Sequence, residues 1–365
     1  MKKSLTFIAL KQAAYIGFVA TILSACQPQK LENTLDGSPL DNLPTYITKL
    51  TDEGSRADWA RDGKKLLYIK GTEKSTLGQV HEIDIETKEV TNLTDGYTNY
   101  GYTRAMYLAN GDLLLCGPEY VDPLSTEEDA GRLDAVLWVH QKPFDKEPVN
   151  MKEKCWEGPS VANNRMRIGW VDSNIDWDNP IAILTGYSKM FIADIVYIDG
   201  KPTLDNKKQI LDRKDVFPFA LETQSFRPPN DNELIYNIYA KDNGTVQGIN
   251  LDTGKTTKYS NSKLYEEAEG IFPDGKMVTV ERDLRPIPIP TIIDIWTLSL
   301  DEEATYKRLT YFSYYKGFGA SNPVIRGDGR YMAFQLKDAN GSHGAGLGIL
   351  LFDFDAYNAH EDSKK

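Results

Sequence analysis

The chain has 365 residues, a formal net charge of −11 and 26% charged residues. A surface this acidic repels phosphate backbones, so nucleic acid is excluded as an expected partner. The three cysteines and four histidines are spread along the sequence, and a zinc site is therefore not expected.

Residues 1–25 have the pattern of a bacterial signal peptide. Lys2 and Lys3 precede an apolar run over 13–25, which is shorter than the about 20 residues that a membrane-spanning helix requires. The run ends in Leu23-Ser24-Ala25-Cys26, which resembles the lipobox of bacterial lipoproteins, where the cysteine is acylated and becomes the first residue. The alternative is an ordinary signal peptide, or a short membrane anchor, with a chance cysteine. We expect membrane lipid to be attached at Cys26 and to hold the chain at the cell envelope.

Residues 26–43 are expected to form a lipidated tether, because they are rich in Gln, Pro, Asn, Gly and Ser. Gln27 stands where an inner-membrane retention signal would have Asp. In a Gram-negative bacterium, the outer membrane is therefore the expected location.

From residue 44 to 357 one pattern of strands and turns recurs, and it predicts an all-β propeller. In the first copy, the segment 56–69 contains two strands joined by Asp62-Gly63, and strands over 80–85 and 90–94 follow. Asp-Gly and Asn-Gly favour two-residue hairpins because such a turn needs φ > 0. The corresponding later turns are Asn110-Gly111, Asn163-Asn164, Asn230-Asp231-Asn232, Asp274-Gly275 and Asp328-Gly329.

Six such turns, at intervals of about 43 to 68 residues, predict a propeller of six four-stranded blades. The longest interval leaves room for a seventh blade. An additional strand over 46–51 precedes the first unit, and the last unit has only three evident strands. Lys49-Leu50-Thr51 matches Asn92-Leu93-Thr94 and Arg308-Leu309-Thr310, which end other units. We therefore expect the N-terminal strand to complete the last blade, with residues 358–365 as a C-terminal tail.

The segments Asp58–Tyr68 and Asn322–Phe334, together with Phe272–Lys276, resemble the TolB-like propeller repeat, whose core reads Pro-x-x-Ser-Pro-Asp-Gly-Lys-x-Ile-x-Phe. This resemblance implies a fold and no activity, since propellers serve as binding modules, lyases and hydrolase gates. TolB is similar to this chain only in its propeller, so the role of TolB is not implied. The sequence has no G-x-S-x-G motif, which argues against serine hydrolysis of the dipeptidyl-peptidase kind.

Two further motifs have alternative readings. Asp172, Asn174, Asp176 and Asp178 alternate oxygen ligands as a calcium loop does, yet glycine is missing from the sixth position. The segment is either a solvated polar loop or a structural calcium site, and no other cofactor is expected. Cys116 and Cys155 could pair in an exported protein, but their spacing does not decide the question.

The innermost strand of each propeller blade lines the central channel, and here it precedes each Asp-Gly-type turn. Polar side chains that converge from several blades suit a polar ligand. We predict a ligand-binding channel mouth formed by Arg104, Gln224, Glu269, Arg282 and Asn322.

The favoured function is an envelope-anchored binding module for a glycan or a protein partner. The alternative is a carbohydrate-active enzyme, a polysaccharide lyase or hydrolase that uses the channel mouth. A lyase needs a base and a cation that neutralises the substrate carboxylate. Tyr102 or His343 would then be the base, and Arg104 or Arg282 the cation. The oligogalacturonate-lyase propellers, which the chain distantly resembles, use a histidine-rich metal site that its scattered histidines do not suggest.

The lipid anchor is directly testable. Replacement of Cys26 by Ala removes the acylation site, so the variant should be released from membranes by washing, whereas the wild type stays bound. Incorporation of labelled palmitate into the wild type measures the modification itself. Absence of label from a wild-type chain that is exported would refute the lipoprotein prediction.

Overall fold

The computed structural model describes residues 35–364, except for 73–74, 123, 126–130, 177–178, 217–218, 241–242, 261, 263, 284–292 and 339–345. Residues 1–34, with the predicted signal peptide and Cys26, lie outside the described residues. So do two predicted site residues, Asp178 and His343.

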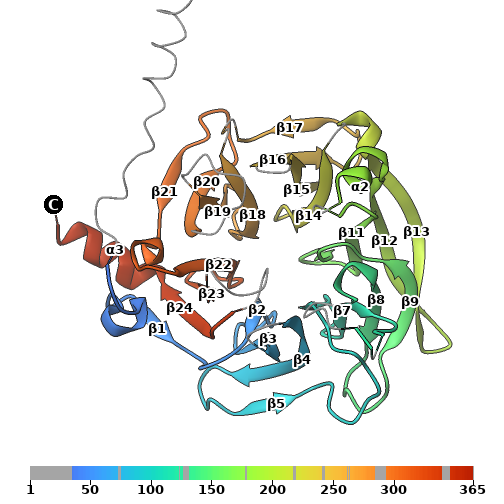
Figure 1. The fold of residues 1–365 in the computed structure, drawn as a ribbon, viewed down its shortest axis with the longest axis horizontal. Helices are drawn as coiled ribbons and strands as arrows, with labels where there is room; N and C mark the ends of the chain where they lie inside the picture. Colours follow the sequence, from blue (N-terminus) through green and yellow to red (C-terminus); the bar gives the residue numbers. More distant parts are fainter. Residues whose placement is uncertain are drawn as a thin grey trace, which may run out of the picture.

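Six four-stranded antiparallel sheets surround a central axis, so the chain is a six-bladed β-propeller (Figure 1). Blade 1 consists of β2 (Ser55–Trp59), β3 (Lys65–Thr72), β4 (Ser75–Asp84) and β5 (Val90–Asn92). Blade 2 consists of β6 (Arg104–Tyr107), β7 (Leu113–Pro118), β8 (Ala135–His140) and β9 (Val149–Lys154). Blade 3 consists of β10 (Ser160–Val161), β11 (Arg167–Ser173), β12 (Ser188–Ile198) and β13 (Lys201–Asp212). Blade 4 consists of β14 (Ala220–Phe226), β15 (Glu233–Ala240), β16 (Asn243–Asn250) and β17 (Thr256–Lys258). Blade 5 consists of β18 (Tyr265–Ile271), β19 (Met277–Asp283), β20 (Asp294–Ser299) and β21 (Tyr306–Arg308). Blade 6 consists of β22 (Phe318–Ile325), β23 (Tyr331–Asp338), β24 (Ile349–Asp353) and β1 (Ile47–Lys49).

Each predicted Asp-Gly-type turn joins the first and second strands of a blade, which confirms the repeat. The glycines of four of these turns have positive φ, as the turn geometry demands: Gly63, Gly111, Gly275 and Gly329. The described residues form six blades and no seventh. The room that the sequence left for one is occupied by the long hairpin of β12 and β13 and by helix α2 (Pro180–Thr185).

The N-terminal strand closes the ring, as predicted. Strand β1 pairs antiparallel with β24, with Ile47 opposite Phe352 and Lys49 opposite Leu350. The repeated Leu-Thr pair has a physical reason in the three blades that contain it. The threonine hydroxyl group after the outer strand accepts a hydrogen bond from a backbone N–H of the third strand and so extends the ladder by one bond. These bonds run from Val80 to Thr94 (3.0 Å), from Ile295 to Thr310 (2.9 Å) and from Ile349 to Thr51 (2.9 Å).

The hydrophobic core lies between the blades. Six buried apolar clusters occur, one at each junction of neighbouring blades. Blades 5 and 6, for example, share a cluster that contains Ile295, Leu309 and Phe334. Burial of such side chains contributes about 1.5–3 kcal/mol each, so the stability of the ring comes mainly from these junctions.

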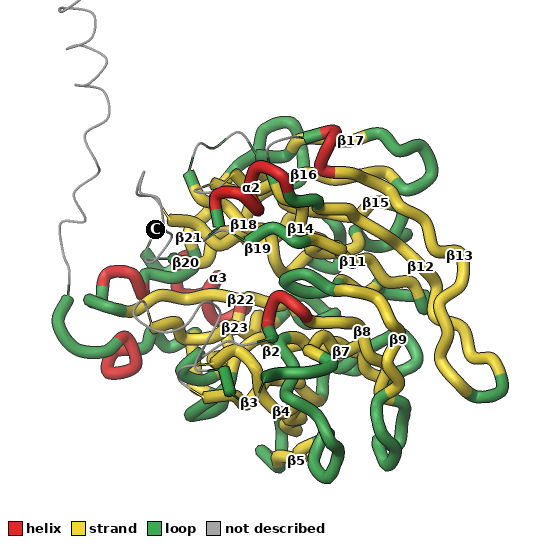
Figure 2. The backbone as a smooth tube through the Cα atoms, turned by 45° about the vertical axis from the view of Figure 1, so that its right-hand side comes forward, coloured by secondary structure: helices red, strands yellow, loops and turns green. Residues whose placement is uncertain are grey.

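Short helical segments lie at the periphery of a structure that is otherwise mostly strand (Figure 2). Helix α3 (Phe354–Asp362) extends into the predicted tail, and its buried Tyr357 packs on Tyr46 with ring centroids 5.1 Å apart. The 3-10 helix η1 (Pro39–Asn42) occupies part of the predicted tether, where Leu40 packs against the same cluster. Among the residues described, no helix has the length and apolar character needed to cross a membrane.

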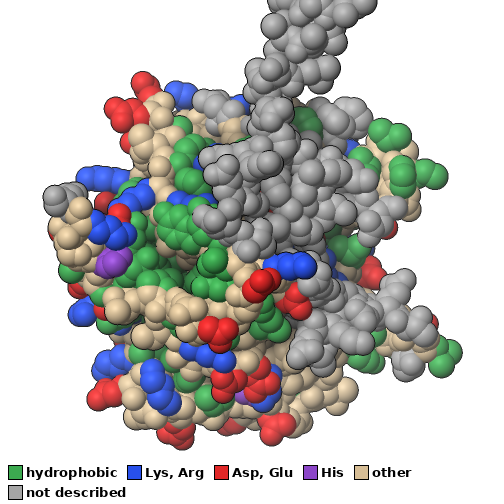
Figure 3. Space-filling view, turned by 60° about the vertical axis from the view of Figure 1, so that its left-hand side comes forward, with side chains coloured by type: hydrophobic (Ala, Val, Ile, Leu, Met, Phe, Trp, Pro, Cys, Tyr) green, Lys and Arg blue, Asp and Glu red, His purple; other side chains and the backbone are tan. Residues whose placement is uncertain are grey.

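Charged side chains of both signs are interspersed over the described part of the face in Figure 3.

Cys116 and Cys155 are buried free thiols in this structure, and Cys116 Sγ donates to the Cys155 carbonyl oxygen at 3.4 Å. Burial raises the pKa of the Cys155 thiol well above its usual value.

Ring closure predicts the effect of a deletion. Removal of residues 44–51 deletes β1 and leaves β24 as an unpaired edge, so the protein should aggregate or unfold. Circular dichroism and light scattering during heating would measure this. A deletion variant that melts cooperatively at the wild-type temperature would contradict the assignment.

A milder pair of variants tests the same junction. Thr51→Val keeps the shape but removes the acceptor for the Ile349 N–H group, which should lower the free energy of unfolding by about 1–3 kcal/mol. Thr51→Ser retains the hydroxyl and should behave more like the wild type.

Candidate functional site

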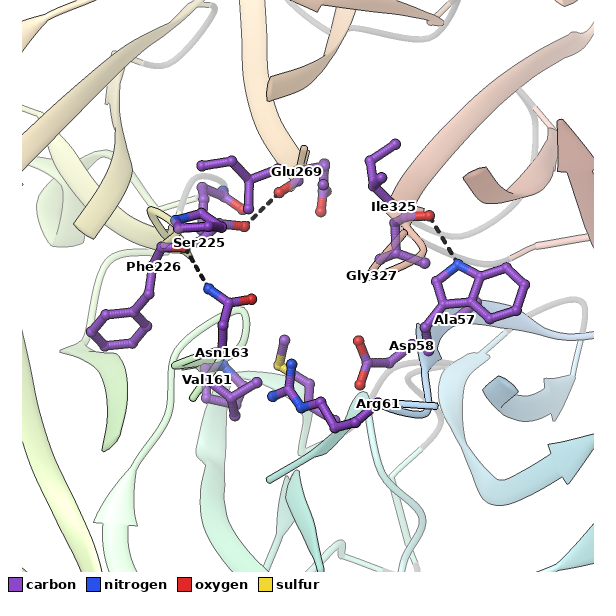
Figure 4. Close-up of a pocket in the computed structure, with 18 of the residues that line it drawn as sticks. Ala57, Asp58, Arg61, Val161, Asn163, Ser225, Phe226, Glu269, Ile325 and Gly327 are labelled. Carbon is purple, nitrogen blue, oxygen red and sulfur yellow. Dashed lines mark hydrogen bonds between the residues drawn. The ribbon is translucent and has the colours of Figure 1, made fainter. Parts of the chain in front are cut away.

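A cavity of about 600 Å³ occupies the central channel. Inner strands of all six blades, or the turns that follow them, contribute to its wall. Figure 4 shows the labelled side chains arranged around an open centre, with Asp58, Arg61 and Asn163 directed toward it. The turn residues Arg61, Asn163 and Gly327 lie in the lining, so the cavity extends toward the side of the ring that bears the Asp-Gly-type turns.

β-Bulges direct polar side chains to this wall. In four inner strands the pairing shifts at corresponding places, between Ser55 and Asp58, Thr223 and Ser225, Ala268 and Ile271, and Ser321 and Val324. A bulge leaves a residue unpaired and turns its side chain away from the regular alternation. The polar residues at these places are Arg56, Gln224, Glu269 and Asn322.

Side chains of the preceding blade hold these bulges. Gln335 Oε1 accepts the Arg56 N–H group at 2.8 Å, and Glu281 Oε1 accepts the Asn322 N–H group at 2.6 Å. Arg56 and Asn322 have φ values of 52° and 50°, which are unfavourable for residues other than glycine. The hydrogen bonds therefore fix a strained backbone that presents both side chains.

Arg104 connects several of these groups. Its Nη1 donates to Asn322 Oδ1 at 2.6 Å, and its Nη2 lies 4.0 Å from Glu269 Oε1. The structure thus brings together three of the five residues named from the sequence for the channel mouth: Arg104, Glu269 and Asn322. Arg104, Glu269 and Gln224 line the cavity, whereas Asn322 is not part of the lining and contacts it through Arg104.

The carboxyl groups of the channel are strongly perturbed. Burial raises the pKa of Glu222 and of Glu269 well above the usual range, and nearby Glu267 raises both further. Burial and Glu267 likewise raise the pKa of Glu281 to about 7, and burial raises that of Asp58 to about 6. Water-poor surroundings disfavour ionised carboxylates, so this wall has acid groups that can hold protons near neutral pH.

Two buried donors of the wall lack hydrogen-bond partners. They are Gln224 Nε2 and Arg56 Nε, on side chains that belong to residues only 8% and 5% exposed. Other polar groups of the wall are occupied, since Arg61 Nη2 donates to the carbonyl oxygens of Tyr107 and Ala162. Buried polar groups are normally paired, so unpartnered donors in a cavity indicate a place for water or a ligand.

Two predicted site residues lie elsewhere. Arg282 is on β19, where its Nε lies 2.8 Å from the fully buried Glu266 Oε1, and its guanidinium stacks on Tyr306. Arg282 does not line the cavity. It lies in a regularly paired part of β19 without a bulge, so its side chain packs against Glu266 and Tyr306 instead. Tyr102 is 2% exposed and packs in the core between blades 1 and 2. In this position it cannot reach a substrate in the channel.

The predicted calcium loop is already internally bonded. Asp172 Oδ1 accepts the Tyr187 hydroxyl at 2.9 Å, and Asn174 Oδ1 accepts the Tyr187 N–H group at 2.6 Å. Asp178 and His343 are outside the described residues, so their roles stay predictions. Within the part of the chain that the structure describes, no three His, Cys, Asp or Glu side chains are grouped to hold a metal ion.

The sequence reasoning missed Arg56 and Glu222, which both line the cavity. Arg56 had a detectable signal, because it stands six positions before Asp62 just as Asn322 stands six positions before Asp328. Glu222 lies before the Gln224 bulge, and no sequence pattern marked it.

The Glu281 environment predicts a pH dependence of stability. A carboxyl group with a folded pKa near 7 and an unfolded pKa of about 4.5 binds its proton more tightly in the folded state. Its contribution to stability is therefore complete below pH 4.5 and is lost as the pH rises to 7. Glu281→Gln should flatten the decrease in melting temperature over this interval, measured by calorimetry. The exposed Glu86→Gln should leave the slope unchanged, and an equal slope in both variants would contradict the assignment.

Comparison with known proteins identifies a fold and no closer relationship. No family model matches the chain, and no curated protein matches it. A gluconolactonase from Xanthomonas campestris is 11% identical with a TM-score of 0.51, covering 84% of this chain and 88% of its own. An oligogalacturonate lyase in complex with manganese is 15% identical with a TM-score of 0.50 (85% and 78% covered). TolB from Acinetobacter baumannii is 14% identical with a TM-score of 0.42 (84% and 67% covered). The six blades and the repeated turns agree with the TolB-like propeller fold predicted from the sequence.

Proposed function

We propose that the protein is a binding module of the cell envelope whose axial cavity takes up a segment of a glycan. The observation that carries the proposal is a cavity of about 600 Å³ into which several blades direct polar side chains. This volume lies within the roughly 300–1,000 Å³ of small-molecule sites. In this proposal lipid on Cys26 holds the propeller at a membrane, which in a Gram-negative bacterium is the outer one.

The chemistry of the wall suits hydroxyl groups. A sugar hydroxyl both donates and accepts hydrogen bonds, and the cavity offers both kinds of partner. Gln224 Nε2 is a buried donor without a partner, while Glu222 and Glu269 supply carboxyl oxygens. Because bulges and interblade hydrogen bonds fix much of the inner wall, a ligand would lose little free energy in ordering it.

A catalytic use of the same cavity is the second candidate, and one observation favours it. Glu222 and Glu269 have raised pKa values through burial, and a carboxyl group that keeps its proton near neutral pH can serve as a general acid in glycan cleavage. One observation argues against a lyase: the predicted base Tyr102 is buried outside the cavity. Binding without turnover is therefore the preferred function.

The test is titration of the purified protein with acidic and neutral oligosaccharides in a calorimeter. Arg104→Ala should weaken binding by well over tenfold, because loss of a buried charged contact costs about 2–5 kcal/mol. Gln224→Ala removes one neutral donor, and its effect should be smaller, about 0.5–1.5 kcal/mol. Gln209→Ala replaces an exposed glutamine on β13. It is the matched control and should bind as the wild type.

The same samples distinguish the alternatives. Heat of binding without new reducing ends or unsaturated uronates supports a binding module, whereas appearance of either product establishes an enzyme. No response to any glycan, combined with a protein partner recovered by crosslinking, would replace the glycan proposal by one of envelope assembly.

A further inference from the structure

The inner part of the axial cavity contains a cation whose charge is poorly compensated. Arg56 lines the cavity, yet the residue is only 5% exposed. Its Nη1 donates to the Thr103 carbonyl oxygen at 3.1 Å, while its Nε has no hydrogen-bond partner. A buried guanidinium normally has a carboxylate or several acceptors around it, and a single backbone carbonyl does not meet that need.

The groups around Arg56 reinforce this imbalance. Arg104 lines the same cavity, and its nearest paired carboxylate oxygen, on Glu269, is 4.0 Å away. Arg132 is also nearby but is paired with Glu157. Burial, followed by the charges of Arg104 and Arg132, lowers the pKa of Arg56 to about 9. Glu157 and Glu269 act on Arg56 in the opposite direction. Although burial opposes it, the pKa of Arg104 is raised by Glu269, Glu222, Glu267 and Glu157. Burial raises the pKa of Glu222 and Glu269 well above the usual value, so in their protonated forms these two carboxyl groups compensate the arginines only in part.

The backbone of Arg56 is held in place at a cost. A φ of 52° is unfavourable for a residue with a long side chain, and such backbone strain persists only where the surrounding structure holds it. The buried Gln335 Oε1 fixes it by accepting the Arg56 N–H group at 2.8 Å. The fold thus keeps a strained, desolvated cation in the lining of the cavity.

We propose that Arg56 and Arg104 form a subsite for an oxyanion group of the ligand: a carboxylate, sulfate or phosphate. An oxyanion accepts charge-assisted hydrogen bonds from guanidinium groups, which are stronger than neutral ones. It would supply the missing acceptor of Arg56 and reduce the repulsion between the two arginines. This inference rests on the proposed function and makes it narrower, since it assigns an acidic glycan in preference to a neutral one.

The first experiment uses inorganic sulfate with the purified wild-type protein. Calorimetric titration, with sodium chloride at equal ionic strength as reference, should detect saturable binding, because general salt effects do not saturate. Arg56→Gln should bind sulfate at least about tenfold more weakly, since a charged hydrogen bond is lost. Arg330→Gln, whose side chain is 49% exposed, is the matched control and should bind as the wild type. Absence of saturable binding to the wild type, or equal binding by Arg56→Gln, would overturn the subsite.

The second experiment separates this subsite from the glycan proposal. Acidic and neutral oligosaccharides of equal length are titrated into the wild type, which should prefer the acidic one by about tenfold or more. Equal affinity for both would refute the subsite and leave the glycan function standing. Saturable sulfate binding without any glycan binding would refute the glycan function, leave the subsite standing and identify a free anion as the ligand. If Arg56→Gln does not fold, Arg56→Lys retains the charge without the planar fork and should lose most of the preference.

Discussion

The inner wall of this propeller depends on hydrogen bonds that cross from one blade to the next. A side-chain oxygen on the second strand of one blade accepts a backbone N–H group at or beside the bulge of the following blade. The acceptors are Asn237, Glu281 and Gln335, and the donors are Ala268, Asn322 and Arg56, at 2.6 to 2.9 Å. All three acceptors are at most 4% exposed, and loss of one would leave a buried donor unsatisfied, which costs about 1–3 kcal/mol. These bonds fix the positions of the channel side chains.

Much of the fold could be predicted, because its features repeat and have local causes. The Asp-Gly-type turns require positive φ, and Leu-Thr pairs end three of the outer strands with a hydroxyl acceptor. Both features are visible as sequence patterns, so the closing strand before Ser55 could be identified from Leu50 and Thr51. The number of blades was ambiguous because length alone does not distinguish an extra blade from a long hairpin such as β12 and β13.

The candidate site could be predicted only in part, since bulges carry no clear sequence signal. Gln224, Glu269 and Asn322 were found because they are polar residues on the inner strands that precede the turns. Arg282 was misplaced because regular alternation on β19 turns it toward Glu266 and Tyr306. Arg56 was overlooked although it corresponds to Asn322. Its significance depends on burial and on an orphaned Nε atom, which are properties of the assembled ring.

The propeller separates the parts that stabilise it from the part that can recognise a ligand. Apolar clusters at the six blade junctions provide most of the burial, and none of them requires a polar channel. The wall, by contrast, keeps Arg56 and several buried carboxyl groups where apolar side chains would cost less desolvation free energy. Stability therefore does not explain Arg56, Glu222 and Glu269, which line the cavity. The oxyanion subsite proposed above would account for the two cavity arginines, because an oxyanion accepts charge-assisted hydrogen bonds from guanidinium groups.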